Sequence, residues 1–215
     1  MTSAPLLAGV APDKAQVLCV FVHGRGQSPE AMEEAVIRRL STPGVACLLP
    51  RAATGSWYGA RAVDPLNAET RGELAASLAE LARDITALRT RAAHLPLLLA
   101  GFSQGACLAL EHAFAAGPWS GALAAFTGCR VGQVQDTRPA ADLTGLPVYL
   151  SGGDADPWIP VSAFAEAAAA LGHAHARLRA DIFPDRPHEV SAAEIAILDG
   201  MLADLAAGRH MNWSR

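Results

Sequence analysis

Buried-strand patterns and helical patterns follow one another along most of this chain, and this succession restricts the fold more than any other feature. Residues 16–22 (QVLCVFV) form a continuous apolar run, which is typical of a strand buried on both faces. Residues 70–91 instead place large apolar side chains at helical spacing. Strands that are joined through helices pair in parallel by right-handed crossovers. The sequence therefore predicts an α/β fold with a mostly parallel central sheet and helices on both faces.

The same patterns assign the remaining elements. Strands are expected at 16–22, 45–49, 97–102, 122–127, 148–151 and 177–183, and helices at 31–40, 70–91, 104–115, 161–171 and 192–206. Ser191 and Glu194 form a capping box before the last helix. The 215 residues suit a single domain spanning 1–215, with its core from about residue 16 to residue 206. The tail at 208–215 is expected to be detached and disordered.

Composition excludes several classes of protein. The net charge of −4 argues against a broad basic surface, so no nucleic-acid partner is expected. No apolar run approaches the roughly 20 residues that cross a bilayer, and the N-terminus lacks the basic start of a secretory signal. The cysteines are dispersed and form no C-x-x-C pair: Cys19, Cys47, Cys107 and Cys129. We therefore expect a cytoplasmic protein with buried thiols, without integral membrane association and without a bound metal.

Residues 101–105 (GFSQG) match the pattern G-x-S-x-G. Five residues alone are weak evidence, because a serine can also simply cap a helix. Here, however, an apolar strand runs directly into Ser103 and a helical segment starts directly after it. This strand–turn–helix context is that of a nucleophile elbow, in which glycines leave room for the sharp turn. Ser103 is therefore the candidate nucleophile.

A serine hydroxyl needs a general base, and in this fold the chain order is serine, acid, histidine. His188 lies in the loop between the last strand and the last helix, at the carboxyl edge of the predicted sheet. His173 and His175 follow a helix in a polar stretch, where exposure to solvent is expected. Their H-x-H spacing lacks the additional ligands of a metal site. His188 is therefore the candidate base.

Two aspartates compete for the role of the acid. Asp154 and Asp156 both follow the strand at 148–151, and their spacing does not choose between them. A carboxylate in this position fixes the imidazole tautomer and stabilises the imidazolium. The other aspartate would cap a turn or form an ion pair.

Backbone N–H groups are expected to bind the oxyanion. One belongs to Gln104, directly after the serine, and the other to Arg25, in the His-Gly-Arg-Gly loop after the first core strand. The alternative for this loop is an ordinary glycine-rich turn. For the Arg25 side chain, we expect a solvated surface position rather than a contact with an acidic substrate group.

Taken together, these segments resemble the phospholipase/carboxylesterase family, which includes bacterial carboxylesterases and acyl-protein thioesterases. The resemblance runs from Val17 to Leu205 and is carried by residues 23–26 (HGRG), 56–58 (SWY), 101–105 (GFSQG), 153–160 (GDADPWIP) and 187–190 (PHEV). It implies an α/β-hydrolase fold. The sequence departs from the family at Ser151, where a histidine is frequent, and at Gln27, where an aspartate is frequent.

The resemblance also implies roles for individual residues. By position, Ser103 would be the nucleophile, Asp156 rather than Asp154 the acid, and His188 the base. The N–H groups of Arg25 and Gln104 would form the oxyanion hole. The resemblance further implies that Trp57 lies beside the acyl pocket.

The expected activity is hydrolysis of small-molecule carboxylic esters or lysophospholipids through an acyl-enzyme, with no metal or organic cofactor. A thioesterase acting on acyl-proteins or acyl-CoA would use the same residues. A dienelactone-type hydrolase would carry a cysteine nucleophile, but Cys107 lies one turn into the helix and is expected to point into packing. A non-catalytic binding module of the same fold is the remaining alternative.

The expected cleft is shallow and open. Residues 129–145 are too few for the helical lid of true lipases. Trp57, Tyr58, Leu66 and Trp158 are candidate apolar walls that bind substrate, with simple packing as the alternative for each. No feature of the sequence sets the oligomeric state, and a homodimer is compatible with it.

Overall fold

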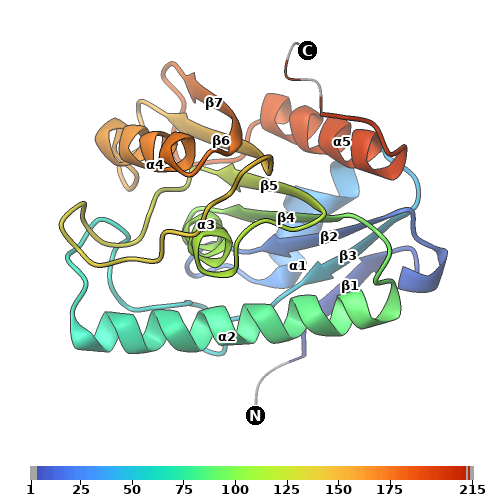
Figure 1. The fold of residues 1–215 in the computed structure, drawn as a ribbon, viewed down its shortest axis with the longest axis horizontal. Helices are drawn as coiled ribbons and strands as arrows, with labels where there is room; N and C mark the ends of the chain where they lie inside the picture. The colour runs from blue at the N-terminus through green and yellow to red at the C-terminus, as the bar shows by residue number, and fades with distance from the viewer. Residues whose placement is uncertain (1–3, 212, 214–215) are drawn as a thin grey trace.

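The computed structural model describes residues 4–211 and 213. Its centre is a seven-stranded sheet with the order β1-β3-β2-β4-β5-β6-β7, shown in Figure 1. Only the edge strand β1 is antiparallel to its neighbour, and the remaining strands are parallel. The strands are β1 (Leu6–Gly9), β2 (Val17–Val22), β3 (Val45–Leu49), β4 (Leu97–Phe102), β5 (Gly121–Phe126), β6 (Pro147–Gly153) and β7 (Arg177–Phe183). The predicted α/β class is thereby confirmed.

Helices cover both faces of the sheet because alternate residues of the central strands point to opposite sides. In β2, Leu18, Val20 and Val22 pack in one apolar layer with α2, α3 and α4. The intervening residues of β2 pack in a second layer with α1 and α5. All six residues of β2 are buried. The helices are α1 (Pro29–Ala35), α2 (Ala68–Arg91), α3 (Gln104–Ala116), α4 (Val161–His173) and α5 (Ala192–Ala206).

Three segments differ from the prediction. β1 was not expected, and the helix expected at 31–40 ends as α1 at Ala35 before a short 3₁₀ turn, Ile37–Arg39. The tail was expected to be detached, but Met211 is buried in the layer beneath α5, and Trp213 packs against the same layer. Burial of these two apolar side chains is favourable, which explains why the segment after α5 packs against this layer. The other tail residues, 212 and 214–215, lie outside the described part.

The carboxyl ends of the parallel strands lie at one edge of the sheet, and four loops meet there. They follow β2, β4, β6 and β7 and carry His23–Gln27, Ser103, residues 154–160 and residues 184–191. Residues 127–146, all of which the structure describes, contain no helix, so no large lid domain covers this edge. Among the described residues, no helix has the length and apolarity to span a bilayer.

Candidate active site

Ser103 occupies a strained turn between β4 and α3. Its φ of 55° and ψ of −121° lie in a region that costs a non-glycine residue about 1–3 kcal/mol. The flanking glycines make the turn possible. A Cβ on Gly105 would lie 2.1 Å from the carbonyl oxygen of Val22, and one on Gly101 would lie 2.5 Å from the backbone of Gly105. The strand and the helix therefore approach so closely that only glycine fits at either position.

A chain of hydrogen bonds joins three side chains from separate loops. The Oγ of Ser103 lies 2.8 Å from Nε2 of His188, and Nδ1 of His188 lies 2.7 Å from Oδ2 of Asp156. The Asp156 side chain is fully buried, and its Oδ1 accepts hydrogen bonds from the backbone N–H groups of Trp158 and Ile159. Because an ionised carboxylate only accepts, Nδ1 of His188 carries the proton. Nε2 is then free to accept the proton of the serine hydroxyl.

The geometry separates the two aspartates that their spacing in the sequence did not distinguish. Oδ1 of Asp154 accepts a hydrogen bond of 2.6 Å from the backbone N–H of Asp185. Asp154 therefore anchors the start of the loop that carries His188. Of the two aspartates, only Asp156 is hydrogen-bonded to the imidazole.

The loop after β2 lies directly beside the serine. A Cβ on Gly24 would come within 3.2 Å of the Cβ of Ser103. Among the described residues, none accepts a hydrogen bond from the backbone N–H of Arg25 or of Gln104. Two free donors on the edge that carries the serine are what an oxyanion hole requires.

The buried side chain of His23 stabilises the loop after β2. Its buried imidazole contacts the carbonyl oxygen of Gly24 through Nδ1 at 2.7 Å, and its Nε2 accepts from the N–H of Ala52 at 3.1 Å. Burial lowers the pKa of His23, so the ring is neutral, with its proton on Nδ1. The indole N–H of Trp57 donates to the carbonyl oxygen of His23.

The side chains of Gln104 and Arg25 both hold the segment 56–60. Oε1 of Gln104 accepts from Ser56 and Trp57, and its Nε2 donates to the carbonyl oxygen of Tyr58. The Arg25 guanidinium donates to the carbonyl oxygens of Gly59 and Ala60. The side chain lies at the surface, as expected. Arg25 is exposed, but its side chain is tied to the neighbouring loop.

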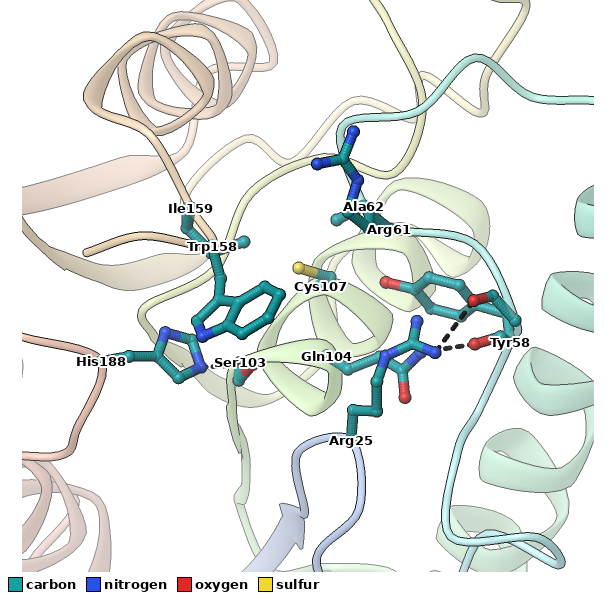
Figure 2. Close-up of a pocket in the computed structure, with 11 residues that line it drawn as sticks. Arg25, Tyr58, Arg61, Ala62, Ser103, Gln104, Cys107, Trp158, Ile159 and His188 are labelled. Carbon is teal, nitrogen blue, oxygen red and sulfur yellow. Dashed lines mark hydrogen bonds between the residues drawn. The ribbon is translucent and has the colours of Figure 1, made fainter.

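A pocket of about 390 Å³ opens above the serine (Figure 2). Its polar lining residues are Arg25, Arg61, Ser103, Gln104 and His188, and its apolar ones include Tyr58, Ala62, Cys107, Trp158 and Ile159. Trp158 is 61% exposed, so an indole surface is available beside the serine. Tyr58 and Trp158 thus lie where the sequence analysis placed walls of the pocket.

Two other candidate wall residues lie elsewhere. Trp57 is 3% exposed and does not line the pocket, since its indole is turned toward His23 behind the loop. Leu66 is also absent from the lining and packs beside Gly132. The expected wall position of Trp57 is therefore not found, because its indole is held by the carbonyl oxygen of His23.

Cys107 is fully buried in the apolar layer, as expected, and it also borders the pocket (Figure 2). The backbone N–H of Cys129 donates to its Sγ at 3.4 Å. Hydrogen bonding from Cys129 lowers the pKa of the Cys107 thiol, and burial opposes this shift. Its position four residues after Ser103, on the same helix face, is the sequence signal that could have placed it there. All four cysteines are free and buried, as expected.

A buried ion pair that the sequence analysis missed supports the loop of His188. The Arg186 guanidinium donates to the carbonyl oxygen of Glu189 and to Oγ1 of Thr127, and it lies 3.5 Å from Oε1 of Glu194. The Glu194 side chain is fully buried and accepts from the Ser151 hydroxyl at 2.5 Å. Glu194 also caps α5, as expected. The ends of β5, β6 and α5 are thereby fixed to the backbone on both sides of His188.

Glu194→Ala is expected to lower the free energy of unfolding by about 3–5 kcal/mol, because it leaves the buried Arg186 charge without its partner. Urea denaturation measures this change. Glu34→Ala, which breaks an exposed i,i+4 pair with Arg38, is the matched control and should have almost no effect. Equal losses in the two variants would contradict a structural role for the buried pair.

The described residues contain no group of three or more histidine, cysteine, aspartate or glutamate side chains placed to hold a metal ion. His173 and His175 are both exposed, as expected. His175 contacts one carboxylate, that of Asp142, at 3.3 Å.

The strand order and the serine turn place the chain in the α/β-hydrolase class of folds. Within that class, the sequence profile of the phospholipase/carboxylesterase family matches residues 10–205, and the chain belongs to this family. The hydrolase family predicted from the motifs is thereby confirmed.

Solved structures agree with this assignment. A phospholipase/carboxylesterase from Dyadobacter fermentans is 28% identical, with 93% of this chain and 95% of that chain covered and a TM-score of 0.82. A carboxylesterase from Mesorhizobium loti is 21% identical (93% and 93% covered, TM-score 0.73), and SOBER1 from Arabidopsis thaliana is 18% identical (86% and 97% covered, TM-score 0.72). The last two show similarity of fold. Among curated proteins, no significant match is found.

Proposed function

We propose that this protein hydrolyses small-molecule carboxylic esters through an acyl-enzyme on Ser103. The observation that carries the proposal is the continuous hydrogen-bond chain from Ser103 through His188 to Asp156. The free N–H groups of Arg25 and Gln104 on the same edge of the sheet support it. Membership of the phospholipase/carboxylesterase family agrees with this chemistry.

In the proposed reaction, Ser103 Oγ attacks the ester carbonyl carbon while Nε2 of His188 takes the hydroxyl proton. The carbonyl oxygen becomes an oxyanion that accepts hydrogen bonds from Arg25 and Gln104. When the bond to the alcohol breaks, His188 returns the proton to the leaving oxygen. A water molecule then attacks the acyl-serine in the same way, and the carboxylic acid leaves. Asp156 stabilises the imidazolium at each stage.

The test is stoichiometric labelling with diethyl p-nitrophenyl phosphate, beside initial rates on p-nitrophenyl esters of increasing acyl length and on a lysophosphatidylcholine. We expect one equivalent of p-nitrophenol per chain, a diethylphosphoryl adduct on the peptide that contains Ser103, and loss of ester hydrolysis in proportion to labelling. The ester with the highest kcat/KM would define the acyl length that the pocket accepts. A folded protein that hydrolyses no ester, or an adduct on Cys107, would refute the proposal.

A further inference from the structure

A second cavity, of about 350 Å³, lies against His188, which alone among the described residues lines both this cavity and the catalytic pocket. One side is formed by Met32, Ala35 and Val36, in and just after α1. Phe102 and Val190 contribute to the other side. The imidazole, whose ring centre lies 5.0 Å from that of Phe102, therefore stands between two spaces of similar volume.

The lining of the second cavity suits an uncharged group. Its charged side chains, Arg39 and Glu189, have opposite signs and are exposed. Neither forms an ion pair with another described residue, and Arg39 makes only a long hydrogen bond to the carbonyl oxygen of Ala35. The cavity therefore offers no net charge to an anionic or cationic substrate group. Gln27 adds an uncharged amide to its lining, and the remaining apolar walls favour hydrocarbon.

In the proposed reaction, the acyl half and the alcohol half of the ester contact different residues. The acyl half stays bonded to Ser103, which lies in the catalytic pocket with the two oxyanion donors. The alcohol half must bring its oxygen within hydrogen-bond reach of Nε2 of His188 to receive a proton. The second cavity borders the same imidazole and so lies within reach of a group that extends from this oxygen.

We propose that the second cavity binds the alcohol half of the ester and selects uncharged alcohols with a bulky hydrocarbon body, such as cyclohexanol. The catalytic pocket then holds the acyl half. This assignment rests on the proposed ester hydrolysis and adds the class of leaving group.

Two filling variants test the assignment, one in each space. Ala35→Trp fills the second cavity from an exposed position on α1, and Ala62→Trp fills the apolar side of the catalytic pocket. Ala62→Leu is a smaller alternative if the tryptophan disturbs folding. The substrates are methyl acetate, cyclohexyl acetate and methyl octanoate, with acid release followed by pH-stat. Each variant is compared with the wild type on the same ester, so intrinsic reactivity cancels.

Ala35→Trp is expected to lower kcat/KM for cyclohexyl acetate by about tenfold or more. For methyl acetate and methyl octanoate, kcat/KM should change less than about twofold. Ala62→Trp should lower kcat/KM for methyl octanoate more than for either acetate. The assignment would be overturned if Ala35→Trp lowered kcat/KM equally for the two acetates, or if it lowered kcat/KM selectively for methyl octanoate. Either result would leave ester hydrolysis established. A wild-type protein that hydrolyses none of the three esters would refute the proposed function itself.

Discussion

Ser103→Ala and His188→Ala are each expected to lower kcat for p-nitrophenyl butyrate by a factor of about 10⁶, and the double variant should lose no more than either single one. The hydroxyl and the imidazole share one hydrogen bond and act as a unit, so removing either disables both. Initial rates at high protein concentration measure the loss. Pretreating each sample with diethyl p-nitrophenyl phosphate corrects for trace wild-type enzyme.

Some catalysis should survive these substitutions. The N–H groups of Arg25 and Gln104 remain in place. We therefore expect a residual rate about 10³–10⁴ times that of the uncatalysed reaction in water. Ser162→Ala, in an exposed turn of α4, is the matched control and should keep the wild-type rate. If Ser103→Ala retained more than about 1% of the wild-type kcat, another nucleophile would have to carry the reaction.

The central strands were predictable because both of their faces are buried. β3 and β4 have the bounds expected from the sequence, and β2 differs by one residue. β7 also has the expected bounds, although it is an edge strand without a buried residue. β1 gave no comparable signal, since its four residues form a short edge strand that is half exposed. The helix expected through residue 40 ends early because Val36 leaves the helical conformation, with a φ of −127°. Burial of both faces thus explains why β2, β3 and β4 could be predicted.

The loops that carry the candidate site were also predictable, because parallel strands end at one edge of the sheet. The directions of individual side chains were not. Trp57 and Tyr58 are neighbours, yet only Tyr58 lines the catalytic pocket. The support of the His188 loop by Arg186 depends on groups from β6 and α5 that come together only in the folded chain. Such contacts leave no local pattern in the sequence.

Asp156→Asn is expected to lower kcat by a factor of about 10⁴ with little change in KM. An asparagine in this position presents an amide N–H or a weaker oxygen acceptor to Nδ1 of His188. The ring then no longer keeps its proton on Nδ1, and Nε2 loses the lone pair that accepts the serine proton. Values of kcat and KM for p-nitrophenyl butyrate separate this effect from a loss of substrate binding.

Asp154→Asn is the matched control, two residues away in the same loop. The asparagine retains Oδ1, which can still accept the hydrogen bond from the N–H of Asp185. The variant should therefore keep kcat within a few-fold of the wild type. A large loss of kcat in Asp154→Asn with normal activity in Asp156→Asn would reverse the two assignments. Because both changes remove one charge from the same loop, a difference between them isolates the contact with His188 from the general electrostatics of the site.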